Sequence, residues 1–267
     1  MSRARTRILC LGLTLWACAS PRRLPAAEGK AREPGQAVSV AAAANLIYAL
    51  EALDGRFTEL HPRVAVTTST GASGNLVAQI RNGAPYDVFL SADRDFAERL
   101  VRGGQAKAET LRVFGIGRLA LWTTRPGLDL GAVDRAVLDP AVRRIALANP
   151  ETAPYGLAAR QALEKLGLWD TVQPRLVRGE NVSQAAEFVE TGNADAGFVA
   201  LSLLMSPKLR DRGRWIEVPA GLYLPLSQVA VLTTRGAANP AARDYIGFLG
   251  SQDAGSILEA FGYRLPR

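Results

Sequence analysis

The sequence predicts an α/β protein with two lobes, each a mixed and mostly parallel β-sheet flanked by helices. One unit recurs along the chain: an apolar strand, a loop of small residues and an amphipathic helix. Strands that alternate with helices form parallel sheets covered on both faces. Two further apolar stretches, 111–123 and 228–233, are placed as a pair of crossovers between two sheets. The 267 residues are enough to build two cores.

The first lobe is expected to contain residues 38–118 and 231–267. Its strands are expected at 38–43, 64–70 and 87–91, and its helices at 46–60, 75–81 and 93–102. Pro62 ends the first of these helices, because proline cannot continue the helical hydrogen bonding. Two C-terminal helices after Pro240 complete this lobe.

The second lobe is expected to contain residues 119–230. Its strands are expected at 144–148, 176–177, 196–201 and 215–219, and its helices at 156–166 and 182–191. Right-handed crossovers place every strand-to-helix loop at the carboxyl edge of its sheet. The loops of the two lobes are therefore expected to face each other across a ligand crevice.

The N-terminus predicts export to the periplasm. Residues 1–27 have the pattern of a signal peptide, with three early arginines and an apolar run at 8–19 that is too short to span a bilayer. Cleavage fits after small residues at 17–19 or at 26–27, and residues 15–18 also resemble a lipobox that would acylate Cys18. Residues 28–37 are expected to form a tether. Both cysteines, Cys10 and Cys18, lie in the leader, so the body has no disulfide and no thiolate site.

The net charge of +7 does not indicate a nucleic-acid-binding protein. Five arginines and no acidic residue lie within residues 1–27, so the body carries only 7 − 5 = +2. A nearly balanced body lacks the basic patch that binding to phosphate backbones requires.

Four loops are expected to face the crevice, and none of them contains Lys or Arg. They are Ala44-Asn45, 72–74, 154–156 and Asn181-Val182. The first N–H groups of a helix are unpaired and carry partial positive charge, so converging helix starts can hold a dianion without a countercharge. The hydroxyls of Ser73 and Tyr155 and the amide of Asn45 can add donors.

The loop tips also lack an acidic residue, which favours a fully deprotonated oxyanion that needs donors only. Glu180 is the nearest acid in sequence, and we expect it to point outward or to cap the next helix. Each loop residue also has a purely structural interpretation. Ser73 and Asn45 could be helix N-caps, Tyr155 could cover its loop, and Val182 could be a core residue of the first turn.

An enzyme is the main alternative class, and the sequence offers little to build one. His61 is the only histidine and precedes Pro62 at a helix end, so neither a Ser-His-Asp triad nor a His-rich metal site is available. Asp87 and Asp93 form a carboxylate pair around a strand, and we expect them to anchor a loop and cap a helix. No direct side-chain metal site and no cofactor are expected.

Five segments resemble a known family over residues 38–265. They are 41–50, 70–93, 144–170, 178–202 and 248–263, and they include the runs TGASGNL and RGENVSQAA. They resemble the periplasmic molybdate-binding proteins of ABC transporters, the ModA family, which have the class II periplasmic-binding-protein fold. The resemblance implies a monomeric, non-enzymatic binding protein that delivers molybdate, and tungstate as well, to a membrane permease.

The resemblance also implies the ligand-binding residues. Carried over by motif, they are Ala44, Asn45, Ser73, Tyr155 and Val182, where Ala44 and Val182 act through their backbone amides. Many family members have Ser at position 45 and Tyr at position 200, where this chain has Asn45 and Ala200. We therefore expect Tyr155 to supply the hydroxyl that position 200 lacks.

Other ligands remain possible alternatives. Ferric sites need several Tyr, His or carboxylate ligands, and organic anions usually recruit Arg, whereas the four loops offer one Tyr and no Arg. Another oxyanion such as sulfate is therefore the main alternative ligand, and an enzyme on the same fold is the less favoured function. Molybdate and tungstate are larger than sulfate at equal charge and shape, so discrimination against sulfate is expected to come from a pocket size that a rigid backbone sets.

Overall fold

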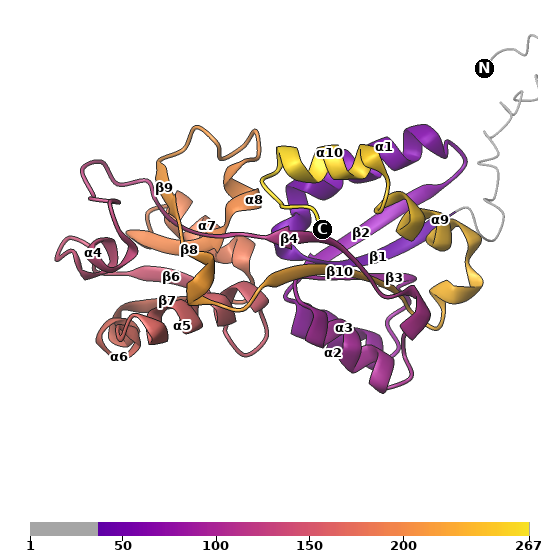
Figure 1. The fold of residues 1–267 in the computed structure, drawn as a ribbon, viewed down its shortest axis with the longest axis horizontal. Helices are drawn as coiled ribbons and strands as arrows, with labels where there is room; N and C mark the ends of the chain where they lie inside the picture. The colour runs from indigo at the N-terminus through magenta and orange to yellow at the C-terminus, as the bar shows by residue number, and fades with distance from the viewer. Residues whose placement is uncertain (1–36, 267) are drawn as a thin grey trace, which may run out of the picture. The chain divides into compact units, whose positions relative to one another are not determined.

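Two five-stranded β-sheets organise residues 37–266, the part of the chain that this computed structural model describes (Figure 1). The first sheet has the strand order β2-β1-β3-β10-β4. Its strands are β1 (Ala37–Ala43), β2 (Ala65–Gly71), β3 (Val88–Ser91), β4 (Arg112–Gly117) and β10 (Leu226–Leu232). β1, β2 and β3 pair in parallel, and β10 pairs antiparallel with both β3 and β4. Four of the five strands therefore run in one direction.

The second sheet repeats this arrangement with the order β7-β6-β8-β5-β9. Its strands are β5 (Leu119–Thr123), β6 (Ile145–Ala148), β7 (Leu176–Gly179), β8 (Ala196–Ala200) and β9 (Arg214–Glu217). β6 pairs in parallel with β7 and β8, and β5 pairs antiparallel with β8 and β9. The expected fold class, two mixed and mostly parallel sheets flanked by helices, is confirmed.

Helices cover both faces of the first sheet. Alternate residues of a strand point to opposite faces, so each strand contributes side chains to both cores. On β1, Val38 and Val40 pack with one group of helices, and Ala41 packs with the other. The first group is α1 (Ile47–Leu60), α9 (Pro240–Phe248) and α10 (Gln252–Ala260), and the second is α2 (Ser73–Arg81) and α3 (Arg94–Arg102). Figure 1 shows α1 and α10 above this sheet and α2 and α3 below it.

The second sheet has its own core around Trp122 and Phe198, both fully buried. The helices around it are α4 (Val133–Leu138), α5 (Pro154–Lys165), α6 (Trp169–Val172), α7 (Val182–Glu190) and α8 (Leu201–Leu204). Short 3-10 helices occur at Ala44–Leu46 (η1), Ala108–Thr110, Gln173–Arg175, Ala220–Leu222 and Gly236–Ala238.

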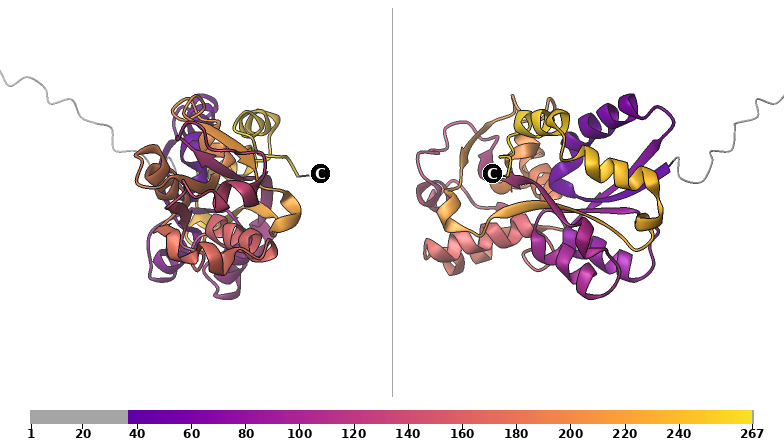
Figure 2. Two further views of the ribbon diagram at one scale, coloured as in Figure 1. Left: turned by 90° about the vertical axis from the view of Figure 1, so that its left-hand side faces the viewer. Right: turned by 45° about the vertical axis from the view of Figure 1, so that its right-hand side comes forward.

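Two chain segments connect the sheets, and they lie side by side (Figure 2). Arg118 alone separates β4 from β5, and the lobes are expected to divide next to it, between residues 118 and 119. The second connection leads from β9 to β10, and Leu226 already pairs with Gly117 of the first sheet. The division expected between residues 230 and 231 thus falls inside β10, because this strand enters the first sheet directly after Pro225.

The expected signal peptide at residues 1–27, with the alternative acylation of Cys18, lies outside the described residues. So does the expected tether, except that Ala37 is the first residue of β1. Within residues 37–266, no helix is both long enough and apolar enough to cross a membrane.

Candidate functional site

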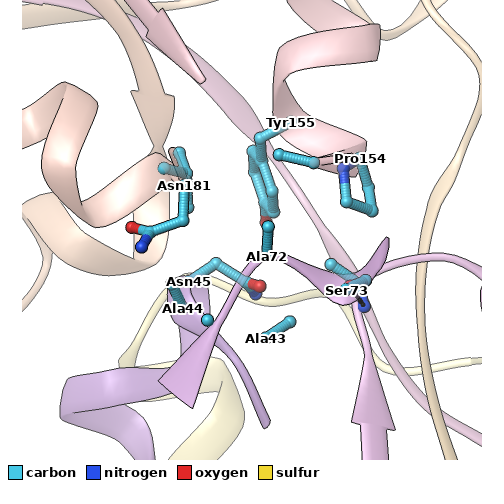
Figure 3. A pocket seen from close by; sticks show the side chains of 12 residues that line it. Ala43, Ala44, Asn45, Ala72, Ser73, Pro154, Tyr155 and Asn181 are labelled. Carbon is cyan, nitrogen blue, oxygen red and sulfur yellow. Dashed lines mark hydrogen bonds between the residues drawn. The ribbon is translucent and has the colours of Figure 1, made fainter. Parts of the chain in front are cut away.

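A small cavity lies between the carboxyl ends of the two sheets (Figure 3). It contains about 190 Å³ of empty space, against about 1160 and 1200 Å³ in two larger surface hollows. Its lining combines both halves of the molecule: Ala43, Ala44, Asn45, Gly71, Ala72, Ser73, Ala92, Ala153, Pro154, Tyr155, Asn181 and Val182. All five residues expected to bind the ligand are among these twelve, and no residue of the lining is charged. The cavity is therefore suited to a small solute held by neutral groups.

Ser73 contributes its hydroxyl from the first residue of α2. The N-cap of this helix is Ala72, which has no capping side chain, so Ser73 is not the N-cap. Its Oγ accepts a hydrogen bond of 3.2 Å from the N–H of Ala92, which leaves the hydroxyl hydrogen available. Ser73 is fully buried, so this hydrogen is best used by a group inside the cavity.

Asn45 is held by a buried network. Its Nδ2 donates to Gln228 Oε1 and to the Tyr263 hydroxyl, both at 2.8 Å. The orientation of Gln228 is fixed, because its Nε2 donates to the carbonyl of Leu226 at 2.8 Å. Both Nδ2 hydrogens of Asn45 are therefore used inside the protein, and its Oδ1 has no partner among the described residues.

The first loop can consequently offer an anion its backbone N–H groups more readily than the side-chain amide expected from the sequence. Ala44 and Asn45 lie in η1, directly after β1, and no capping side chain covers its start. Asn45 does not act as an N-cap either, because Ala43 has that position. The side chain of Asn45 fixes the loop in place.

Tyr155 enters the cavity from the opposite side, at the second residue of α5, after Pro154. Figure 3 shows its ring extending toward Ala72 and Asn45. Its hydroxyl is buried and has no hydrogen-bond partner among the described residues. Burial raises the pKa of Tyr155 well above its ordinary value of 10.0, so the hydroxyl stays protonated and can donate. Gly117 makes room for it, because a Cβ there would overlap this hydroxyl.

Val182 begins α7 after the N-cap Asn181. The Asn181 side chain accepts from the N–H groups of Ser183 and Gln184 at 3.0 and 3.1 Å. The N–H of Val182 is not used by this cap and remains available to the cavity, which Val182 lines. Glu180 is exposed and is not part of the lining, as expected, and the cap is Asn181.

The residues considered for catalysis have structural roles. His61 stacks on Phe57 at the end of α1, with 4.4 Å between the ring centroids. Asp93 caps α3 by accepting from Phe96 N–H at 3.0 Å. Asp87 accepts from Ser39 N–H and from Arg235 Nε, both at 3.0 Å. Within residues 37–266, no cluster of three or more His, Cys, Asp or Glu side chains could hold a metal ion.

Three residues of the site were not expected from the sequence: Gln228, Tyr263 and Ser202. The Tyr263 hydroxyl and Ser202 Oγ both donate to the backbone carbonyl of Asn45, at 3.0 and 2.8 Å. All three are buried, and they come from β10, the C-terminal segment and α8. No local motif marks them, because they act on Asn45 across long stretches of sequence.

Comparisons with known proteins agree with this geometry. The family model of bacterial extracellular solute-binding proteins matches residues 38–264. Molybdate-binding protein ModA of Azotobacter vinelandii is 39% identical over 260 residues, covering 97% of this chain and 96% of the relative. The chain belongs to the ModA family of bacterial extracellular solute-binding proteins.

Two further matches extend this assignment. ModA of Rhodobacter capsulatus is 38% identical over 254 residues, covering 94% of this chain and 95% of the relative. The solved periplasmic molybdate-binding protein of Azotobacter vinelandii superposes with a TM-score of 0.82 at 38% identity, covering 86% of this chain and all of that chain. The two-lobed periplasmic-binding-protein fold is thereby confirmed.

Membership of the ModA family also decides between a binding protein and an enzyme, the two classes of protein considered from the sequence. Its members are solute-binding proteins of transport systems and not enzymes, so the expectation of a binding protein is confirmed. The solute is a ligand of such proteins and not a cofactor.

Proposed function

We propose that this protein captures molybdate in the cavity between its two sheets and delivers it to the permease of an ABC importer. One observation carries the proposal: a small buried cavity, lined from both halves by twelve uncharged residues, at the starts of four helices. Each helix start carries unpaired N–H groups and partial positive charge, and four of them meet at this cavity. This arrangement suits a dianion that needs only hydrogen-bond donors. The names of the relatives and the family assignment support molybdate as this anion.

We assign the ligand-binding role to Ala44, Asn45, Ser73, Tyr155 and Val182. Ser73 and Tyr155 donate through their hydroxyls, and Ala44, Asn45 and Val182 through their backbone N–H groups. A donor to a charged group contributes about 1.5–3 kcal/mol, so a few such bonds are enough for tight binding of a small anion.

Tungstate is proposed as a second ligand, because it has the same charge and shape. Sulfate is a smaller tetrahedron, and a cavity with a backbone-built wall discriminates against it through size. We propose that the two lobes divide at Arg118 and just before β10, and that they close on the anion by rotation about these two connections.

We also propose that the chain is exported by residues 1–27 and acts as a monomer in the periplasm. Acylation of Cys18 is the alternative to cleavage further along and would tether the protein to the membrane. Mass spectrometry of the mature protein distinguishes the two, because acylation leaves a lipid on an N-terminal Cys18.

A thermal-shift panel tests the ligand class. Molybdate, tungstate, sulfate and phosphate are each added at the same concentration to the purified protein. A ligand at 100 times its Kd stabilises the folded state by about 2.7 kcal/mol, which raises the unfolding midpoint measurably. We expect molybdate and tungstate to raise it and the other two to leave it unchanged. A shift with sulfate and none with molybdate would refute the proposed function.

A further inference from the structure

Hydrogen bonds join the two lobes on both sides of the cavity. On one side, Ser202 Oγ donates to the carbonyl of Asn45. This bond lies near the connection between the sheets, because the neighbouring Leu201 N–H donates to the carbonyl of Arg118 at 2.9 Å. On the other side, the N–H of Gly74 donates to the carbonyl of Thr152 at 2.9 Å. Gly74 belongs to α2 and Thr152 to the loop between β6 and α5, so neither belongs to a connection.

The Gly74–Thr152 contact lies next to residues that line the cavity and residues that line one of the larger surface hollows. Gly74 follows Ser73, which lines the cavity, and it faces the ring of Phe96, which lines one of the larger hollows. Ala153, next to Thr152, lines both the cavity and this hollow. Breaking this contact would therefore open the cavity toward the hollow.

A side chain at residue 74 would be crowded when the contact is made. A Cβ on Gly74 would lie 3.0 Å from the carbonyl oxygen of Thr152 and 3.0 Å from the Phe96 ring, closer than such atoms normally pack. The backbone does not require glycine here, because Gly74 lies in the first turn of α2 and does not have a positive φ. Alanine is the better helix former, so a methyl group at this position is opposed by its two neighbours, the Phe96 ring of the same lobe and the Thr152 carbonyl of the opposite lobe.

We propose that the Gly74–Thr152 contact is the gate of the anion cavity and that glycine at position 74 allows the lobes to close on the ligand. The inference rests on the proposed function, since closure is measured through molybdate. Residue 74 acts on closure, and thereby positions Ser73 and Tyr155 around the same anion.

The proposal predicts that Gly74→Ala affects ligand binding more than folding. In the ligand-free protein the gain in helix propensity of α2 is offset by crowding against the Phe96 ring, so the unfolding temperature should change little. The same methyl group pushes against Thr152 when the lobes close, so molybdate should dissociate faster. Overpacking of this kind corresponds to a rise in Kd of about 5- to 50-fold, with association little changed. A defect confined to the fold of α2 would instead lower the unfolding temperature.

The matched control is Gly247→Ala. Gly247 is also a helical glycine, in α9, and a Cβ there meets nothing within 4 Å. The full chain and both variants are compared by calorimetry with molybdate, by stopped-flow dissociation and by thermal unfolding without ligand. We expect Gly247→Ala to bind as the unmodified protein does.

A further variant separates the two neighbours of residue 74. In Gly74→Ala combined with Phe96→Leu, the ring that crowds position 74 from within its own lobe is removed. If the proposal is right, molybdate should still dissociate rapidly from this double variant, because the carbonyl of Thr152 still crowds the methyl group at position 74. Restored affinity in the double variant, or an unchanged dissociation rate in Gly74→Ala, would overturn the proposal. An unmodified protein that does not bind molybdate at all would instead refute the proposed function, and the gate with it.

Discussion

On the first-sheet side of the cavity Asn45 Nδ2 and Ser73 Oγ already have partners, and only the acceptor Asn45 Oδ1 has none, whereas on the second-sheet side the donor hydroxyl of Tyr155 has no partner among residues 37–266. Asn45 is fixed by Gln228 and Tyr263, and Ser73 Oγ accepts from Ala92. A buried hydroxyl without a partner is costly, and an anion that accepts from it removes this cost. The first-sheet side is thus held in place by the protein itself, and the second-sheet side gains a hydrogen bond at Tyr155 when the ligand binds. Ligand binding should therefore favour the closed arrangement of the lobes.

The largest expected effect comes from Tyr155→Phe, which removes the unpaired hydroxyl and keeps the ring. Molybdate binding should weaken by about 1.5–3 kcal/mol, the contribution of a donor to a charged group. The ligand-free protein should be equally stable or slightly more stable, because it loses an unsatisfied polar group. Calorimetry and thermal unfolding measure the two effects. Tyr86→Phe is the control, since the Tyr86 hydroxyl bonds to Gln79 on the exposed surface.

Ser73→Ala should weaken molybdate binding by about 1–3 kcal/mol. It should also destabilise the ligand-free protein, because the N–H of Ala92 loses its acceptor. The two variants separate these roles, because Ser73→Ala should weaken both binding and folding, whereas Tyr155→Phe should weaken only binding. Ser69→Ala on the exposed part of β2 serves as the control. Unchanged affinity in Ser73→Ala would remove this residue from the site.

Ser202→Ala should have a smaller effect. The carbonyl of Asn45 keeps the Tyr263 hydroxyl as a donor, so the loss is that of one neutral hydrogen bond, about 0.5–1.5 kcal/mol in the free energy of unfolding. Molybdate affinity should fall by less than this. Ser206→Ala is the matched control, because the buried Ser206 Oγ bonds within its own lobe, to the carbonyl of Leu203. An affinity loss as large as that of Tyr155→Phe would mean that Ser202 contacts the anion itself.

The smallest expected effect is that of pH. The lining contains no charged residue and no histidine, and burial raises the pKa of Tyr155 further from neutrality. Because a raised pKa keeps Tyr155 protonated up to and beyond pH 10, its donor is present throughout the neutral range. Affinity for molybdate should therefore be constant between about pH 6.5 and 9. A change of the affinity with pH in this range would indicate an ionisable group in contact with the anion.

The sequence predicted the loops of the site well but misjudged where two helices begin. α7 was correctly expected to start at Val182, because Asn181 is a strong N-cap. α2 and α5 start at Ser73 and Pro154, two residues earlier than expected at each helix. Their N-caps are Ala72 and Ala153, which carry no capping side chain, so the usual start signal is missing. This matters because the earlier start places Ser73 and Tyr155 in the first turn.

The supports of Asn45 could not be predicted from the sequence. Gln228 and Tyr263 are 183 and 218 residues away in the chain, and Ser202 is 157 residues away. Ser202 lies in α8, which begins at Leu201, whereas a strand was expected to continue through Leu201. A short apolar run has no periodicity that separates a strand from a helix. The direction of the Asn45 amide follows from these distant partners. A local sequence pattern therefore could not show that both side-chain N–H groups of Asn45 are already used inside the protein.

The most direct test is a crystal structure of the protein with molybdate, in which anomalous scattering locates the molybdenum. We expect the metal inside the cavity, with the oxygens of the anion accepting from Ser73 Oγ, the Tyr155 hydroxyl and the N–H groups of Ala44, Asn45 and Val182. An anion held by a Lys or Arg side chain, or bound in one of the larger surface hollows, would contradict it.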